Sequence, residues 1–349
     1  MTARPRLSVI VPAYRAMELL PDTLAALVAS DYPRERWELI VVDDAGGDKT
    51  GEVAARWADH VVILDGPPGG PGRGRNAGAA IASGQWLVFV DQDVRIHADA
   101  LSRIAANAVA QPDLVAMFGA YDEHPEERGV LSEYRNLLHR LVHCAGAGDA
   151  ETFWAGCGAV RRDAFDAVHG FDVVRFPRGQ IEDIELGYRL RDNGGRILLD
   201  PAIQGTHLKR WTLGVMVRTD IRDRGIPWMR LLLERGSRRA AALNTGRAEQ
   251  LKVVVAGALM PLAVGAIVLR NSWAALATMT LLLLLLVSNL GTYAWFARQR
   301  GWGFALRIVP LNLIYYFGNA IAAAVGVWQH VTRPASAANS THEHPMATR

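Results

Sequence analysis

The sequence has almost no cysteine. Cys144 and Cys157 are the only two in 349 residues, too few for a disulfide framework, and no Cys/His spacing suggests a zinc site. A G-x-x-x-x-G-K-[ST] element is also missing, which excludes a P-loop. The amino terminus, Met1–Arg6, is too short and polar for a signal peptide. We therefore expect the part of the chain before the apolar segments to stay in the cytoplasm.

Charge is almost absent after Lys252. Three segments carry no acidic or basic residue: Val253–Leu269, Ser272–Phe296 and Ile308–Gln329. A membrane-spanning helix needs about 20 largely apolar residues, so the second and third segments are long enough, whereas the first is marginal and contains Pro261. One such segment alone fits a buried core helix, but three in succession predict a membrane region with about three helices.

The distribution of basic residues predicts an orientation in the membrane. Only Arg270 lies between the first and second apolar segments. The residues before the first segment are Arg235, Arg238, Arg239, Arg247 and Lys252, and those between the second and third are Arg298, Arg300 and Arg307. The positive-inside rule then predicts a multi-pass protein of the cell membrane with the domain before the first segment in the cytoplasm.

Composition divides the chain into four parts. We expect a cytoplasmic domain over residues 1–225, a juxtamembrane segment over 226–252, a transmembrane region over 253–330 and a disordered tail over 331–349, which is rich in Ser, Ala, Thr and His. The stretch Ile226–Leu233 mixes apolar and basic residues. This composition favours an amphipathic helix on an anionic membrane surface, and an ordinary exposed helix face is the alternative.

Strand and helix patterns alternate along the first part of the chain. We predict strands over Leu7–Val11, Trp37–Val42, Val61–Leu64 and Trp86–Val90, and helices over Met17–Ser30, Thr50–Trp57 and from about Arg75 to Ser83, after a Gly/Pro-rich loop over Gly66–Gly74. Alternation of this kind predicts an α/β domain with a Rossmann-like, mostly parallel sheet and right-handed crossovers.

Two carboxylates directly follow the strand that ends at Val90. Asp91 and Asp93 flank Gln92 at its carboxyl end, where open α/β sheets bind their ligands. Separated by one residue, they can offer hard oxygen ligands to Mg²⁺ or Mn²⁺, and a cation there would neutralise a diphosphate. An isolated Asp-x-Asp is more often a solvated turn. The metal-binding interpretation therefore depends on the surrounding motifs.

A loose dinucleotide-binding pattern, G-x-G-x-x-A, occurs at Gly72–Ala77. In dinucleotide-binding folds this fingerprint follows the first strand immediately, whereas here it comes several residues after the third predicted strand. The position disfavours a nicotinamide-dependent oxidoreductase.

An ordered series of motifs from about residue 7 to residue 212 resembles the family 2 glycosyltransferases, which are inverting enzymes of the A-type fold. The matching stretches are Ser8–Tyr14, Glu38–Asp44, Gly74–Gly78, Asp91–Asp93, Gly156–Arg162, Gly170–Asp172 and Ile181–Leu190. The resemblance implies a domain that binds a nucleotide-diphosphate sugar and a divalent cation, Mg²⁺ or Mn²⁺.

The resemblance also implies which residues meet the nucleotide. Pro12, Ala13 and Tyr14 would wall its pocket after the first strand. Asp43 and Asp44 end the second strand, where a carboxylate can accept a hydrogen bond from a uracil or guanine N–H group. Capping of a turn is the alternative for one of these two residues.

Further donor contacts are implied around the third helix and the Asp-x-Asp unit. The resemblance suggests that Arg75 approaches a phosphate and that Asn76, in the same donor-binding motif, caps the helix. Gln92 belongs to the donor site through its place in the motif. Asp93 is the stronger metal ligand, while Asp91 lies nearer the ribose or a metal-bound water.

Glu182 and Asp183 match the ED motif of the family. Inversion at an anomeric carbon needs a base that removes the proton of the acceptor hydroxyl as the diphosphate leaves. The resemblance assigns this role to Asp183 and gives Glu182 a contact with the acceptor or a structural role. The alternative is that two carboxylates at the start of a helix only favour its dipole.

The stretch His207–Trp211 is similar to the QxxRW element of membrane polysaccharide synthases, with His in place of Gln. The resemblance implies that Arg210 binds the departing diphosphate and that Trp211 shapes the acceptor site. A neutral imidazole can ligate a cation, so His207 is a third candidate metal ligand. A hydrogen-bonding or core role is the alternative.

The main hypothesis is a membrane-anchored, metal-dependent, inverting glycosyltransferase that moves one sugar onto a lipid-linked or membrane-proximal acceptor. A processive polysaccharide synthase is disfavoured by the His substitution and by the small number of apolar segments. A catalytically silent membrane scaffold is disfavoured by the joint presence of Asp91, Asp93 and Asp183. We expect a nucleotide-diphosphate sugar, a lipid-linked or glycan acceptor and a membrane as partners, and no nucleic acid.

Overall fold

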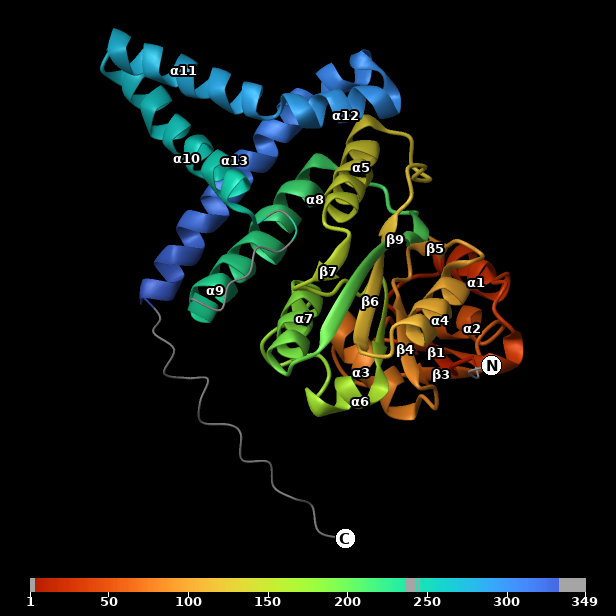
Figure 1. Cartoon of the computed structure of the whole chain (residues 1–349). Coiled ribbons are helices and arrows are strands. Elements are labelled where there is room, and N and C mark those ends of the chain that lie inside the picture. Colours follow the sequence, from red (N-terminus) through yellow and green to blue (C-terminus); the bar gives the residue numbers. More distant parts are fainter. Residues whose placement is uncertain (1–3, 237–242, 244, 333–349) are drawn as a thin grey trace.

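A mixed β-sheet forms the centre of the amino-terminal part (Figure 1). The computed structural model describes residues 4–236, 243 and 245–332, and within them the sheet has nine strands. The strands are β1 (Leu7–Ala13), β2 (Trp37–Asp43), β3 (His60–Ile63), β4 (Trp86–Val90), β5 (Val94–Ile96), β6 (Leu114–Tyr121), β7 (Gly148–Ala150), β8 (Cys157–Arg161) and β9 (Arg196–His207). Their order across the sheet is β3-β2-β1-β4-β8-β6-β9-β5, and β7 pairs with β9.

The first four strands in the sheet order are parallel, as predicted. Every residue of β1, β2 and β4 is buried, which fits strands covered on both faces. The sheet becomes mixed because β8 runs antiparallel to both of its neighbours, β4 and β6. The predicted α/β fold is confirmed, and the parallel edge carries the ends of β1, β2 and β4.

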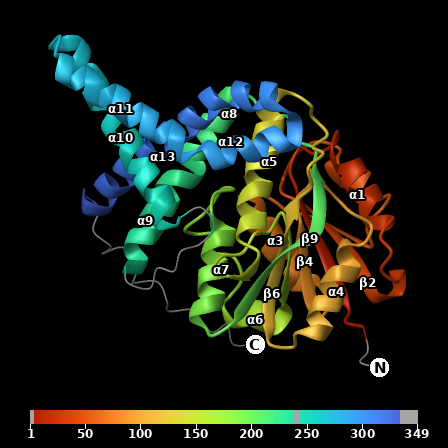
Figure 2. The ribbon, with the colours of Figure 1, turned by 45° about the horizontal axis from the view of Figure 1, so that its top comes forward.

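Helices cover both faces of the sheet (Figure 2). They are α1 (Leu20–Val28), α2 (Thr50–Ala54), α3 (Gly70–Ile81), α4 (Ala100–Ala110), α5 (Val130–Ala145), α6 (Arg162–Ala167) and α7 (Glu182–Asp192), with a short 3₁₀ turn at Arg34–Arg36. Helix α3 packs closely on β1, because its glycines remove side-chain bulk. A Cβ atom at Gly78 would lie 2.5 Å from the Ile10 side chain.

The predicted start of α3 is wrong. The loop expected over Gly66–Gly74 is already helical from Gly70, with Pro71 in the first turn, where proline is tolerated. Oδ2 of Asp44 accepts hydrogen bonds from the backbone N–H groups of Gly69 and Gly70, at 2.8 and 2.7 Å. A carboxylate from the end of β2 therefore caps α3, so Asn76 lies within the helix and its predicted capping role is wrong.

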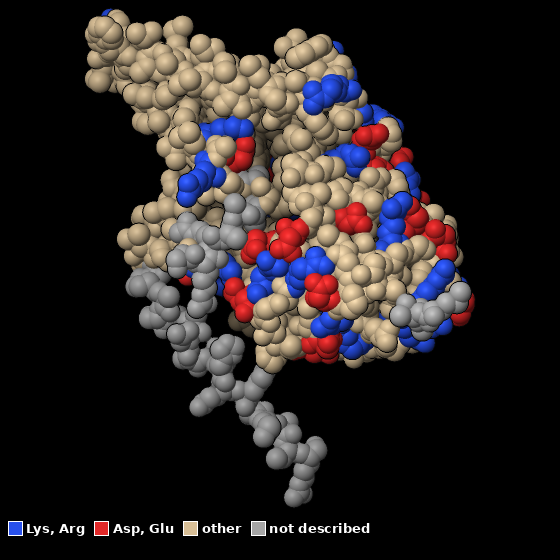
Figure 3. All heavy atoms as spheres, in the orientation of Figure 1, with Lys and Arg blue, Asp and Glu red and all other residues tan. Residues whose placement is uncertain are grey.

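A second group of helices follows the sheet. They are α8 (Leu213–Arg218), a π-helix η2 (Thr219–Gly225), α9 (Ile226–Arg235), α10 (Arg247–Val268), α11 (Ser272–Ser288), α12 (Leu290–Arg300) and α13 (Trp302–Thr332). Helices α10 and α11 project away from the sheet, and the space-filling view shows few charged atoms over them (Figures 1 and 3). Of the disordered tail expected over 331–349, the first two residues are the end of α13, and the rest lies outside the described residues.

Two helices, α10 and α13, are long and apolar enough to cross a membrane. The second predicted span, Ser272–Phe296, is not one continuous helix, since α11 and α12 meet at a 49° bend. The break falls at Asn289, whose Nδ2 donates to the backbone oxygen of Leu285 at 2.8 Å and whose Oδ1 accepts from the Tyr316 hydroxyl at 2.9 Å. If the bent pair counts as one span, three spans are possible.

Helix α5 connects the apolar helices to the sheet. Asn312 of α13 donates to the Tyr134 hydroxyl of α5 at 3.4 Å and accepts from the Tyr293 hydroxyl of α12 at 3.1 Å. Arg300, at the end of α12, pairs with Glu133 of α5 at 2.5 Å. These contacts hold the apolar helices in a defined position against the domain that carries the candidate site.

Candidate active site

The acidic residues predicted at strand ends lie together at one edge of the sheet. Strands β1, β2 and β4 are parallel neighbours, so Tyr14, Asp43 and Asp91 follow them at the same edge. The amide of Gln92 joins two of these ends: its Oε1 accepts from the Tyr14 N–H group at 2.7 Å. Gln92 therefore holds the β1 loop against the Asp-x-Asp unit, and its predicted contact with the donor stays a prediction.

Pro12 and Ala13 are buried within β1, whereas Tyr14 is exposed. Both Asp43 and Asp44 are buried and have backbone partners. Oδ1 of Asp43 accepts from the Gly46 N–H group at 2.9 Å, and Asp44 caps α3. The turn-capping alternative thus applies to both residues, and recognition of the base by either one stays a prediction.

Arg75 joins the two acidic motifs. Its buried guanidinium lies 2.7 Å from Oδ1 of Asp91 and 3.0 Å from Oε1 of Glu182. The neighbouring Asn76 binds both backbone groups of Phe171, donating to its oxygen at 2.8 Å and accepting from its N–H group at 2.9 Å. Helix α3 therefore fixes β4 and the start of α7 relative to each other. Contact of Arg75 or Asn76 with the donor stays a prediction.

Asp183 has the environment of a general base. Burial and the neighbouring charge of Glu182 raise its pKa to about 6, and Arg75 and the Ala155 N–H group act in the opposite direction. The Ala155 N–H group lies 3.2 Å from Oδ2. A carboxyl group with this pKa is charged at neutral pH and still binds a proton readily, which suits proton abstraction from a hydroxyl group.

This electrostatic arrangement predicts the acid limb of a pH–rate profile. The rate should fall about tenfold per pH unit below about pH 6, because protonated Asp183 cannot accept a proton. Glu182→Gln removes a charge that raises the pKa of Asp183, so the limb should move to lower pH. Glu185→Gln, in the same helix and paired with Arg189, is the matched control. An unchanged limb in Glu182→Gln would contradict this assignment of the base.

Asp93 and His207 form the candidate cation pair. Nε2 of His207 lies 3.7 Å from Oδ2 of Asp93, and the ring stacks on Tyr121 with 4.4 Å between centroids. Burial alone would raise the pKa of Asp93, but the His207 ring and the charge of Lys209 outweigh it and lower the pKa. Asp91 faces Arg75 instead, and in the described part of the chain no three His, Cys, Asp or Glu side chains are grouped to hold a metal.

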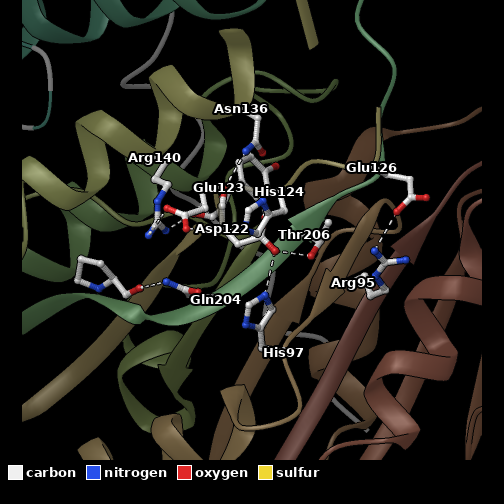
Figure 4. Close-up of polar contacts among 12 residues, drawn as sticks. Arg95, His97, Asp122, Glu123, His124, Glu126, Asn136, Arg140, Gln204 and Thr206 are labelled. Atoms are coloured by element: carbon white, nitrogen blue, oxygen red, sulfur yellow. Dashed lines mark hydrogen bonds and ion pairs between the residues drawn. The ribbon is translucent and has the colours of Figure 1, made fainter. Parts of the chain in front are cut away.

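Asp122 anchors the end of β9 that carries His207 (Figure 4). The hydroxyl of Thr206 donates to Oδ2 of Asp122, and Nε2 of His97 lies 2.9 Å from the same oxygen. The Asn136 amide of α5 donates to the backbone oxygen of Asp122 at 2.8 Å. Asp122 is buried, so this network fixes His207 from β6, the β5 loop and α5.

Arg210 and Trp211 have different surroundings. Arg210 is exposed, and we find no ion pair for it among residues 4–236, 243 and 245–332. The backbone N–H group of Trp211 donates to the Ser132 hydroxyl at 2.9 Å, and the guanidinium of Arg135 lies 4.9 Å from the centroid of the Trp211 ring. Arg210 can therefore reach a ligand, while Trp211 packs on α5.

The structure identifies two residues near the site that the sequence reasoning missed. The positive charge of Arg224, in η2, contributes to lowering the pKa of Asp183, so this side chain acts electrostatically on the candidate base. Tyr121 stacks on His207, and its own pKa is raised by burial and by the charges of Asp93 and Asp91. The π-helical conformation of η2 is a signal often found at functional sites, but the sequence alone does not reveal it.

Solved structures share this architecture. The mannosyltransferase PcManGT from Pyrobaculum calidifontis, solved in complex with GDP-Man and Mn²⁺, superposes with a TM-score of 0.56 and 22% sequence identity. The match covers 94% of this chain and 88% of that one. The fold is therefore that of the A-type glycosyltransferases.

Sequence comparison then indicates a family. Residues 8–168 match the model of Glycosyl transferase family 2, so this part of the chain is similar to a domain of that family. The poly(ribitol-phosphate) β-N-acetylglucosaminyltransferase TarS of Staphylococcus aureus (strain Mu50) is 32% identical over 105 residues, which are 29% of this chain and 18% of TarS. The probable glycosyltransferase YdaM of Bacillus subtilis is 25% identical over 58% of this chain and 50% of its own length. The chain thus spans at most half of either relative.

Proposed function

We propose that the protein is an inverting, metal-dependent glycosyltransferase that moves a sugar from a nucleotide-diphosphate sugar to a lipid-linked or membrane-proximal acceptor. One observation carries the proposal. The guanidinium of Arg75 binds Asp91 of the Asp-x-Asp unit and Glu182 of the ED pair at 2.7 and 3.0 Å. The Asp-x-Asp unit, which we assign to the leaving group, is thus linked to the ED pair, which contains the candidate base Asp183, and this link supports the proposal.

The residues of this chain support a direct displacement. The acceptor hydroxyl donates its proton to the Asp183 carboxylate while its oxygen attacks the anomeric carbon from the side opposite the diphosphate. The bond to the diphosphate breaks in the same step, so the configuration at that carbon inverts. Arg210, exposed at the end of the His207–Trp211 stretch, stabilises the negative charge that develops on the leaving group.

The ligand atoms that Asp93 and His207 offer at this edge of the sheet fit a divalent cation. Asp93 supplies a carboxylate oxygen and His207 an imidazole nitrogen, 3.7 Å apart. Cations such as Mg²⁺ commonly take only one or two protein ligands and complete their shell with substrate phosphates and water. A bound Mg²⁺ or Mn²⁺ would supply positive charge for the diphosphate, and Mn²⁺ accompanies GDP-Man in the PcManGT structure.

The apolar helices support a membrane acceptor. Helices α10 and α13 meet the length and hydropathy of membrane spans, and α12 and α13 contact α5, which borders the site. Together with the positive-inside pattern, this favours a multi-pass protein of the cell membrane with the catalytic domain, residues 1–225, in the cytoplasm.

The proposal is tested by turnover of UDP-, GDP- and dTDP-sugars by the full-length protein. We expect release of the nucleoside diphosphate from one of them, loss of release on addition of EDTA, and recovery with excess Mg²⁺ or Mn²⁺. Asp93→Ala should lower the release by about 10²-fold or more, because it removes the carboxylate that orients the cation. Chromatography of the nucleotides measures it.

Asp99→Ala is the matched control, since the Asp99 side chain is 42% exposed, pairs with Arg103 of α4 and lies outside the site. Its turnover should equal that of the unmodified protein. EDTA-resistant turnover would remove the cation from the proposal, and no turnover of any nucleotide sugar would overturn the proposed activity itself.

A further inference from the structure

A cavity of about 350 Å³ lies between the catalytic domain and the apolar helices. It is formed by the loop before α7, by η2, by α9 and by the carboxyl-terminal end of α13. Helix α9 lies along α13 in both ribbon views (Figures 1 and 2). None of the residues assigned to the donor or to the base lines this cavity.

Three arginines make the cavity basic. Arg175, Arg222 and Arg230 line it, and only Arg175 has an acidic partner, Glu234, in the described part of the chain. The Nε atom of Arg230 is buried and has no hydrogen-bond partner there. Guanidinium groups bind phosphate oxygens through several N–H donors at once. The guanidinium groups of Arg222 and Arg230 are therefore available to bind a phosphate in this cavity.

The position of the cavity selects the source of the anion. Gln329, which lines it, belongs to the last turn of the long apolar helix α13. The adjacent Trp328 is 64% exposed, as is typical of tryptophan at a membrane interface. The side chains of Ile226 and Pro227 add an apolar wall. Basic side chains beside apolar helices at a membrane surface meet lipid phosphates.

The cavity also adjoins the ED pair. Gln180, another lining residue, donates its backbone N–H to Oε2 of Glu182 at 2.8 Å, and it lies three residues before Asp183. An occupant of the cavity thus sits beside the loop that leads to the candidate base.

We propose that this cavity binds the phosphate headgroup of a membrane lipid and holds a phosphate-bearing lipid acceptor beside Asp183. The acceptor part rests on the proposed glycosyltransferase activity, whereas lipid binding does not. Arg222 and Arg230 supply the phosphate contacts, and the apolar wall formed by α9 accommodates the start of the lipid chain.

The test compares lipid retention by the full-length protein in native mass spectrometry, with phosphatidic acid and phosphatidylcholine as probes. The unmodified protein should retain phosphatidic acid preferentially. The double variant Arg222→Gln/Arg230→Gln should weaken this retention by at least about tenfold, because each basic group near a lipid phosphate contributes about fivefold. Arg222→Gln alone is also compared with the control Arg218→Gln, which likewise removes one positive charge, from the neighbouring turn, where Arg218 faces Asp223 at 3.9 Å.

Equal retention by the double variant and the control would overturn the proposal, as would displacement of phosphatidic acid by an equal concentration of inorganic phosphate. Hydrolysis of the sugar donor without acceptor separates this proposal from the proposed function. We expect the double variant to hydrolyse donor at the unmodified rate. If the unmodified protein turns over no nucleotide sugar, with or without a lipid acceptor, the enzymatic proposal fails, while the lipid-binding result stands.

Discussion

Asp183→Asn is expected to lower the rate of sugar transfer by about 10²–10⁴-fold, the range in which a positioned general base contributes. The amide keeps the size of the side chain and can still accept the Ala155 N–H bond at 3.2 Å, but it cannot take the acceptor proton. Donor binding should remain, because it depends on the strand-end residues. Transfer is measured from product formation, and donor affinity from calorimetry with the nucleotide sugar and Mn²⁺.

Asp166→Asn provides the matched control, since Asp166 is exposed at the end of α6 and lies outside the candidate site. Loss of donor affinity in Asp183→Asn would mean that the residue acts in binding rather than in proton transfer. Full turnover would assign the base to another group, with Glu182 the nearest carboxylate in sequence.

Local patterns were sufficient to predict the elements of the parallel edge. The strand Trp86–Val90 was predicted with its observed bounds, since a run of buried apolar residues ends at an acidic unit. The positions of Asp43 and Asp91 at one edge followed from the alternation of strands and helices. The predicted site residues could therefore be assigned to a common region before any distance was known.

Features that depend on distant partners could not be predicted. Arg75 meets Glu182 across 107 positions of sequence, so its buried position between two carboxylates is a property of the packed fold. The cap on α3 comes from Asp44, 25 positions before Gly69, and it stabilises a helix in part of the segment that was expected to be a glycine-rich loop. The break at Asn289 likewise depends on Tyr316, in another helix.

Arg75→Met is expected to lower the free energy of unfolding by about 3 kcal/mol or more, because it leaves the buried Glu182 without its cation. The Glu182 side chain is only 5% exposed, whereas that of Asp91 is 31% exposed and can be solvated. Most of the destabilisation therefore comes from the unpaired charge of Glu182. Thermal denaturation of the full-length protein, followed by tryptophan fluorescence, measures the change. Arg103→Met breaks an exposed pair and should cost at most about 1 kcal/mol.

The double variant Arg75→Met/Glu182→Gln distinguishes a structural cation from one that only binds donor. Glu182→Gln removes the buried charge that Arg75→Met leaves without a partner, so it should restore part of the lost stability. The effects of the two substitutions on the free energy of unfolding should therefore be less than additive. If Arg75 served only a donor phosphate, Arg75→Met would weaken donor binding and leave the melting temperature unchanged. The connection between the Asp-x-Asp unit and the ED pair would then have no energetic significance, and the position of Asp183 relative to the leaving group would need another support.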